Sequence, residues 1–244
     1  DRVVAVLFTS GSTGLPQAHG KTWAMLVANG RAEAEGLGLV GSHTSLVGTV
    51  PVQHSYGFES TFLMAMHGGC AFWSGRPFYP QDVADAVQAV PRPRMVVTTP
   101  FHLGNLLASE VVWPPVDAWL SATAPLEAKV AQQVEARSGA PVFEIYGSTE
   151  TSQLAWRRTT HGPSWRLLPG VQMVQSEDET FAEGGHVGGT VPLSDLIELQ
   201  ADRQFLLHGR HADFINIAGK STSLAYLNHQ LRAIEGVDDG AFFM

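Results

Sequence analysis

The segment Phe8–Pro16 carries residue types that can hold a phosphate group. It reads Phe-Thr-Ser-Gly-Ser-Thr-Gly-Leu-Pro, so glycines and hydroxyl side chains directly follow an apolar run. Glycines let the backbone approach a ligand closely, and consecutive amide and hydroxyl groups can donate hydrogen bonds to phosphate oxygens. An ordinary turn would be favoured for this segment alone, but a predicted strand precedes it and further motifs follow. We therefore expect a phosphate loop at Thr9, Ser10, Gly11, Ser12, Thr13 and Gly14.

Further sets of small, polar and charged residues follow later in the chain. The loop at Phe8–Pro16 is not the Walker pattern, which needs Gly-Lys-Ser/Thr after four intervening residues, and this disfavours a kinase or another ATP-using α/β enzyme of that type. The other segments with such residues are Pro51–Gly57, Ser121–Leu126, Glu144–Thr151, Leu193–Leu196 and Gly209–Lys220.

Taken together and in this order, these motifs resemble those of the adenylate-forming superfamily. That superfamily contains acyl- and aryl-CoA synthetases, luciferases and the adenylation domains of peptide synthetases. The resemblance extends from Val3 to about Gly240. Two departures stand out: Gln17 occupies the position where the family usually has a lysine, and Ser194 replaces the glycine that usually precedes the aspartate at 195.

The resemblance implies a role for each motif. His54 would contact the acid or gate its pocket, while Thr149 would meet phosphate and Glu150 would help to hold magnesium. Mg²⁺ prefers oxygen ligands and usually keeps waters, so one carboxylate with phosphate oxygens is adequate. The remaining nucleotide contacts would come from Ala122, Thr123 and Ala124 along adenine, from Tyr146 stacked on adenine with Gly147 and Ser148 beside it, and from Asp195 and Arg210 at the ribose or phosphate.

Other roles are open for several of these residues. His54 could cap the following helix, and Glu150 could complement a helix dipole. Asp195 and Arg210 could form a surface ion pair of little energetic value. Lys21 lies near Gln17, but nothing in the sequence assigns the missing lysine's role to it.

The elements that must position these residues alternate between strand and helix, which predicts an α/β fold with a largely parallel sheet. In the last helix of the series Leu126, Val130 and Val134 share one face. The predicted strands are Val3–Phe8, Thr44–Val50, Cys70–Trp73, Met95–Thr99, Ala118–Ser121 and Val142–Tyr146. The predicted helices are Lys21–Ala34, Tyr56–Met66, Pro80–Val90, Pro100–Ser109 and Leu126–Ser138.

After about Arg157 the pattern changes to short strands separated by glycine-rich turns, which predicts a smaller β subdomain. We expect an α/β nucleotide-binding core at 1–157, a β subdomain at 158–209, and at 210–244 a hinge with the start of a small C-terminal domain. The expected elements of this half are strands Val187–Val191, Asp195–Leu199, Gln204–His208 and Phe214–Ile217, a helix Ser221–Glu235 and a strand Ala241–Met244.

Composition narrows the classes of function. The net charge of −8, without basic runs, argues against a general role on nucleic acid or at a membrane surface. The single cysteine, Cys70, excludes an intramolecular disulfide and fits the cytoplasm. No stretch is long and apolar enough to span a membrane.

The resemblance implies ATP-dependent activation of a carboxylic acid to an acyl-adenylate. Transfer to a thiol of coenzyme A or of carrier-protein phosphopantetheine would follow, so the expected partners are the acid and an acyl carrier protein. Gly57–Met66 and Ser121–Leu126 would line the acid pocket, and we expect an aryl or acyl acid. Relative to the family, we expect a chain truncated at both ends, without the catalytic lysine. The alternative is a non-catalytic fragment or pseudo-enzyme that binds ATP or AMP.

Overall fold

The computed structural model describes residues 2–9, 17–177, 179–210, 214–217 and 220–223, with positions 227, 231, 234, 236, 237 and 240. Its centre is a nine-stranded mixed sheet. In spatial order the strands are β13 (Asp195–Gln200), β14 (Gln204–Arg210), β9 (Trp165–Leu167), β8 (Ser152–Arg158), β7 (Val142–Ser148), β6 (Ala118–Ser121), β5 (Arg94–Thr98), β3 (Ser45–Gly48) and β4 (Ala71–Phe72).

The sheet has a parallel half and an antiparallel half. Neighbouring strands from β4 through β3, β5 and β6 to β7 are parallel. From β7 through β8, β9 and β14 to β13 they are antiparallel. The predicted α/β class with a parallel core is therefore confirmed. The sheet runs on through residue 157, where a domain boundary was predicted, and the division into three domains stays a prediction.

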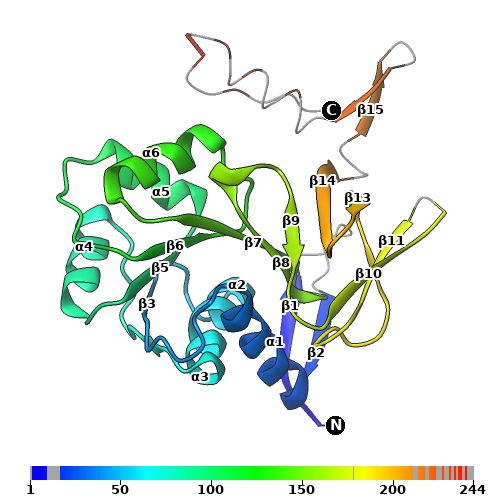
Figure 1. The fold of residues 1–244 in the computed structure, drawn as a ribbon, viewed down its shortest axis with the longest axis horizontal. Helices are drawn as coiled ribbons and strands as arrows, with labels where there is room; N and C mark the ends of the chain where they lie inside the picture. The colour runs from blue at the N-terminus through cyan, green and yellow to red at the C-terminus, as the bar shows by residue number, and fades with distance from the viewer. Residues whose placement is uncertain are drawn as a thin grey trace.

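Helices cover both faces of the parallel half (Figure 1). On one face lies α1 with a continuous helical segment made of α2, the π-helix η1 and α3, and on the other lie α4, α5 and α6. Their bounds are α1 Trp23–Gly36, α2 Ser55–Gly57, η1 Phe58–Leu63, α3 Met64–Gly68, α4 Pro80–Ala89, α5 Pro100–Ala108 and α6 Ala128–Ser138; a short 3-10 turn, η2, spans Thr159–His161.

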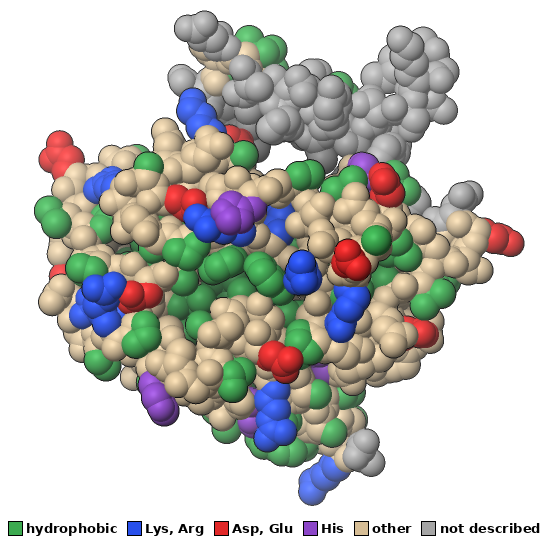
Figure 2. All heavy atoms as spheres, viewed as in Figure 1, with side chains coloured by type: hydrophobic (Ala, Val, Ile, Leu, Met, Phe, Trp, Pro, Cys, Tyr) green, Lys and Arg blue, Asp and Glu red, His purple; other side chains and the backbone are tan. Residues whose placement is uncertain are grey.

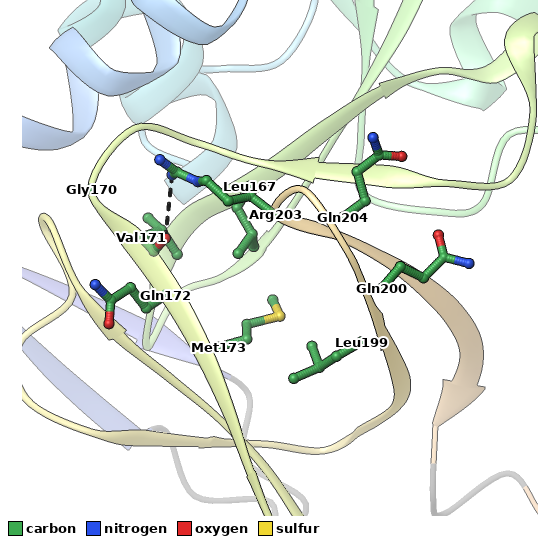
Figure 3. A pocket seen from close by; sticks show the side chains of 9 residues that line it. All are labelled: Leu167, Gly170, Val171, Gln172, Met173, Leu199, Gln200, Arg203 and Gln204. Atoms are coloured by element: carbon green, nitrogen blue, oxygen red, sulfur yellow. Dashed lines mark hydrogen bonds between the residues drawn. The ribbon is translucent and has the colours of Figure 1, made fainter.

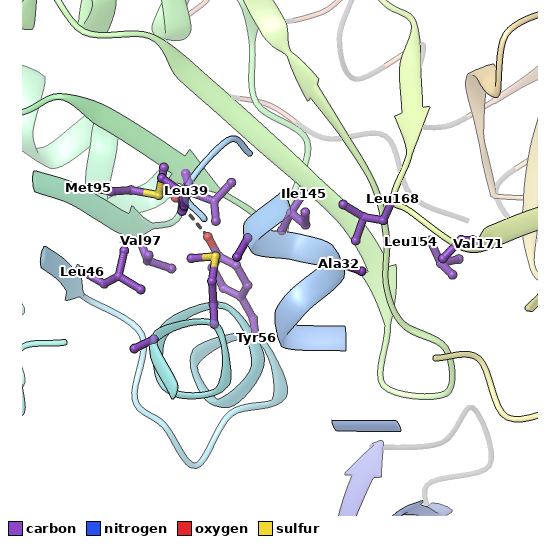
Figure 4. Close-up of a cluster of buried hydrophobic side chains, with 14 of the residues drawn as sticks. Ala32, Leu39, Leu46, Tyr56, Met95, Val97, Ile145, Leu154, Leu168 and Val171 are labelled. Carbon is purple, nitrogen blue, oxygen red and sulfur yellow. Dashed lines mark hydrogen bonds between the residues drawn. The ribbon is translucent and has the colours of Figure 1, made fainter. Parts of the chain in front are cut away.

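Alternation along the parallel strands builds the two cores. Successive side chains in a strand point to opposite faces. In β5, Met95 and Val97 join the cluster under α1 and α3, whereas Val96 joins the cluster under α4, α5 and α6. Figure 4 shows the first cluster, in which the buried Tyr56 donates a hydrogen bond of 3.0 Å to the Leu120 carbonyl. The three-layer arrangement thus follows from strands that are apolar on both sides.

Smaller antiparallel sheets flank the large one. The strands β1 (Val3–Thr9) and β2 (Gln17–Thr22) form a hairpin beside α1. A three-stranded sheet consists of β10 (Val171–Ser176), β11 (Glu179–Gly184) and β12 (Val191–Leu193), and β15 (Phe214–Ile217) pairs with β16 (Lys220–Ser223). No helix in the described part of the chain combines the length and the apolar character needed to cross a bilayer.

Several predicted elements were wrong. Lys21 lies in β2, and α1 begins at Trp23 because the Thr22 hydroxyl caps it by accepting a hydrogen bond from the Met25 amide. Most of the predicted strand Val187–Val191 is a turn, in which Gly189 has a φ of 94° that strands do not adopt. The predicted helix Ser221–Glu235 begins too early, because residues 221–223 lie in β16, although positions 227 and 231 within it are helical. The predicted strand Ala241–Met244 lies outside the described residues.

The stability of the fold should depend on pH through Glu33 of α1. This side chain is fully buried, and burial raises its pKa to about 8. Between the ordinary pKa of 4.5 and about 8 the folded state holds one more proton than the unfolded state, so stability falls as pH rises. The slope from one such group is about 1.4 kcal/mol per pH unit. Glu33→Gln should remove this slope. The free energy of unfolding of the variant should therefore rise relative to that of the parent as pH rises.

Denaturant midpoints measured from about pH 5 to about pH 8 test this expectation. Glu35→Gln is the matched control, because Glu35 is exposed on the same helix. Glu59, whose pKa burial raises to about 7, remains in both proteins and cancels from the comparison to first order. A Glu33→Gln variant whose stability follows the same pH curve as the parent would contradict the expectation.

Candidate functional site

The turn between β7 and β8 carries the second predicted motif, at the carboxyl end of the parallel strands. Ligands in open α/β sheets bind outside these ends. Ser148 and Thr151 bind one another across the turn: the Ser148 amide donates to Thr151 Oγ1 at 3.1 Å, and the Thr151 amide donates to Ser148 Oγ at 3.3 Å. The pairing of β7 with β8 shifts register between Tyr146 and Gly147. The turn therefore has a defined shape that presents Thr149 and Glu150.

Tyr146 and Asp195 lie together although 49 residues separate them in the chain. The Tyr146 hydroxyl donates a hydrogen bond of 2.7 Å to Asp195 Oδ2. The Tyr146 ring packs against Trp165 and Phe205, with centroids 5.7 and 5.6 Å apart. Asp195 pairs in register with Arg210 across β13 and β14. Two residues predicted to bind the nucleotide thus contact one another, and the backbone of a third, Arg210, is paired with that of Asp195.

Glu150 is linked to the hairpin that carries the predicted phosphate loop. Its Oε1 lies 3.6 Å from Nε2 of His19, and the same nitrogen lies 3.1 Å from Oγ1 of Thr9. Thr9 is the last residue of β1, directly before the loop. The predicted loop residues Ser10, Gly11, Ser12, Thr13 and Gly14 lie outside the described residues. The described geometry therefore brings the start of the loop and Glu150 to the same place.

Thr149 and His54 lie near one another, linked through a long hydrogen bond between Thr149 and Ser55. Oγ1 of Thr149 donates to Oγ of Ser55 at 3.4 Å. His54 precedes Ser55 and caps α2, because its Nδ1 accepts a hydrogen bond from the Tyr56 amide at 3.2 Å. The capping role considered for His54 is present, and its ring is exposed beside the site. Its predicted contact with the acid stays a prediction.

The small-residue segment Ala122–Ala124 follows β6 directly and is largely exposed. Thr123 has a φ of 79°, a left-handed conformation that costs energy for a residue with a side chain. The end of this loop is held by Glu144 of β7, which accepts a hydrogen bond of 3.1 Å from the Leu126 amide. Glu144 is itself paired with Arg157. The short side chains of this loop are the residue type expected beside adenine, and that role stays a prediction.

Three residues that support this site, His19, Lys21 and Glu144, were not assigned to it from the sequence. His19 and Lys21 alternate on one face of β2, but the start of a helix was predicted there. Glu144 was quoted only as the first residue of its motif. A strand period of two from Gln17 to Thr22 was the available signal.

The donor set fits a magnesium ion only in part. The described residues contain no group of three or more histidine, cysteine, aspartate or glutamate side chains that could hold a metal. Glu150 offers a carboxylate that is 38% exposed. A hard cation here would therefore take one carboxylate and complete its shell with phosphate oxygens and water, as Mg²⁺ does in nucleotide sites.

A pocket of 360 Å³ lies apart from these residues (Figure 3). It is lined by Met173 of β10, Leu199 of β13 and Arg203 of the following turn, among others. Leu199 and Asp195 lie toward opposite ends of β13, about 13 Å apart at the rise of an extended strand. Figure 2 shows apolar side chains near the middle of one face, with acidic and basic side chains dispersed around them.

Known proteins are similar to this chain in sequence and in fold. A family model described as AMP-binding enzyme matches residues 1–193. A 4-coumarate–CoA ligase of Rhodobacter capsulatus is 27% identical over 235 residues, which are 96% of this chain and 59% of that protein. A 4-chlorobenzoate–CoA ligase of an Arthrobacter species is 30% identical over 162 residues, 60% of this chain and 29% of that protein.

Solved structures agree on the fold. The O-succinylbenzoate coenzyme A synthetase of Bacillus subtilis, in complex with AMP, superposes with a TM-score of 0.84 at 20% identity. That match covers 99% of this chain and 56% of the other. The chain thus spans little more than half the length of the first relatives and structures that it matches.

Proposed function

Because the chain belongs to the family of AMP-binding enzymes, we propose that it activates a carboxylic acid with ATP to form an acyl-adenylate. The observation that carries the proposal is the convergence of Tyr146 with Asp195 and of Glu150 with Thr9 through His19. These residues come from β1, β2, β7, the β7–β8 turn and β13, and both sets of contacts lie near the carboxyl end of β7. A function unrelated to nucleotides gives no reason for this convergence.

In the proposed reaction, an oxygen of the acid attacks the α-phosphorus of ATP, the bond to the leaving oxygen breaks, and pyrophosphate departs. Tyr146 stacks on adenine, and the Tyr146 hydroxyl orients the Asp195 carboxylate to accept hydrogen bonds from ribose. Thr9 and the following loop donate to phosphate, together with Thr149. Catalysis comes mainly from positioning and from stabilisation of developing charge.

Glu150 is the proposed magnesium ligand. When bound, Mg²⁺ would neutralise charge on the phosphate oxygens and so reduce their repulsion of the incoming carboxylate. The protein's part is to hold the Glu150 carboxylate near the phosphates, which it does through the shape of the β7–β8 turn. His54 borders the entrance for the acid, next to the contact between Thr149 and Ser55.

The proposed substrate is an aryl or acyl acid. Glu59 is the carboxylate within Gly57–Met66, and it is 1% exposed and accepts a hydrogen bond from Gln153. It is therefore not available to receive the amino group of an amino acid. The similarity to ligases of coumarate and chlorobenzoate supports an aryl acid. Coenzyme A or the phosphopantetheine of a carrier protein is the proposed acceptor.

ATP–pyrophosphate exchange tests the proposal. The chain should catalyse exchange that depends on an aryl or fatty acid and on Mg²⁺. Exchange that depends on amino acids instead would contradict the substrate class. Binding of AMP without exchange for any acid would support the alternative, a nucleotide-binding protein without turnover. Absence of both exchange and nucleotide binding would overturn both.

A further inference from the structure

Lys21 is buried beneath the turn that carries Thr149 and Glu150. The residue is 1% exposed, and its Nζ donates hydrogen bonds to the Glu150 carbonyl at 2.9 Å and to Ser152 Oγ at 3.0 Å. Its ammonium thus joins β2 to the β7–β8 turn and to the first residue of β8. A buried ammonium is costly unless it is bonded and paired, so this arrangement needs compensating contacts.

Glu59 of η1 supplies the compensating charge. It attracts Lys21 electrostatically and is itself fully buried. Its Oε2 accepts a hydrogen bond of 3.1 Å from Nε2 of Gln153, the residue after Ser152. Three elements, β2, η1 and β8, therefore meet behind the turn through hydrogen bonds and charge.

Ser152 provides an independent sign that the turn is held under constraint. It has a φ of 63° although it carries a side chain, and it is 2% exposed. Such conformations cost energy and persist where the surroundings determine them. The bond from Lys21 to Ser152 Oγ acts directly on this residue. Releasing it should let the turn relax to other conformations.

We propose that Lys21 is a positioning residue, whose two hydrogen bonds fix the backbone from Glu150 to Ser152 and so aim the side chains of Thr149 and Glu150. Its ammonium faces the protein interior and is not a phosphate ligand in place of Gln17. The consequence for activity rests on the proposed function, but the structural role does not.

The test compares Lys21→Met with the double variant Lys21→Met/Glu59→Gln, which leaves no unpaired buried charge. Lys129→Met is the control, since Lys129 is exposed on α6. Hydrogen–deuterium exchange is measured for the amides of the turn, including Ser148 and Thr151, and for β5 and β6. In both Lys21 variants the rate of amide hydrogen exchange in the turn should rise about tenfold, and the rates in β5 and β6 should stay unchanged.

Kinetics give the second readout. In the double variant kcat for pyrophosphate exchange should fall about 100-fold, because misplacement of catalytic groups acts on the chemical step. The KM for ATP should change little, and the Mg²⁺ concentration for half-maximal rate should rise. Mn²⁺ binding in the presence of ATP, followed by electron paramagnetic resonance, should weaken in parallel without any need for turnover.

Three results would overturn the proposal. The turn amides could exchange with deuterium at the parent's rate in Lys21→Met, which would mean that the hydrogen bonds of Lys21 do not hold the turn. The rate could instead return to the parent's value in the double variant, which would mean that Lys21 only neutralises Glu59. Amide hydrogen exchange could instead rise in β5 and β6 as much as in the turn in the double variant, which would mean that Lys21 supports the whole fold. If the parent protein shows no acid-dependent ATP–pyrophosphate exchange, the proposed function fails. The amide hydrogen exchange of the turn still decides the role of Lys21 in that case.

Discussion

Replacement of Glu150 by glutamine is expected to lower acid-dependent pyrophosphate exchange by about 100- to 1,000-fold, the cost of removing one preorganised electrostatic contact. The substitution keeps the size of the side chain and removes its charge. The carboxylate is partly exposed and lies 3.6 Å from His19, so its loss should not disturb the core. The Mg²⁺ dependence of the rate should change with it, because Glu150 is the proposed metal ligand.

AMP binding separates this role from a structural one. AMP lacks the β- and γ-phosphates of ATP and so offers the metal fewer oxygen ligands. Its affinity should therefore change much less than the rate of ATP–pyrophosphate exchange. Glu110→Gln, at an exposed position outside the site, is the control and should behave like the parent protein. Equal loss of exchange and of AMP binding, accompanied by a lower melting temperature, would show that Glu150 is structural.

Replacement of Gly147 by alanine is expected to abolish exchange and to destabilise the fold by about 1–3 kcal/mol, as overpacking does. A Cβ at this position would overlap the Ser152 carbonyl and lie 2.8 Å from the Cα of Gln153. Both obstacles are backbone of the opposite strand and cannot rotate away. The turn would have to move, and Thr149 and Glu150 would move with it.

Gly104→Ala is the matched control for this substitution. Gly104 lies within α5, and a Cβ there would meet nothing within 4 Å. Alanine is favoured over glycine in helices, so this variant should be as stable as the parent or more stable by about 0.5–1 kcal/mol. Denaturant midpoints and exchange rates of the two variants check the pair. A Gly147→Ala protein with the parent's stability and activity would contradict the proposed geometry of the turn.

The parallel half of the fold could be predicted from local sequence. The strands β3, β5 and β6 are short apolar runs bounded by turn residues, and α4 and α5 begin at prolines that are tolerated in a first helical turn. The antiparallel half was predicted less well. Its strands β8 and β9, like β10 and β11 of the three-stranded sheet, carry mixed residues, because their exposed and buried positions depend on neighbours distant in the chain.

Among the site residues, local sequence could identify Tyr146, Thr149 and Glu150, because a motif of consecutive residues at a strand end is visible without the fold. It could not show that Tyr146 donates to Asp195, since strands β8, β9 and β14 lie between their two strands in the sheet. It suggested that His54 could cap the following helix, but it could not decide between that role and a contact with the acid. A cap is decided by where a helix begins, and that boundary is set by tertiary contacts.

By itself the sequence determined the family, the α/β class and the chemical types at the site, since these depend on residue order and on the period of apolar residues. The tertiary structure alone decided the place of Lys21. Read along the chain, this lysine begins a helix next to a loop that lacks its usual cation. In the folded protein it lies in a strand, where its buried ammonium donates to the Glu150 carbonyl and to Ser152 and is attracted electrostatically by Glu59. The reason is physical: a buried charge needs partners that stabilise it, and the partners of Lys21 lie 38 to 131 positions away in the chain.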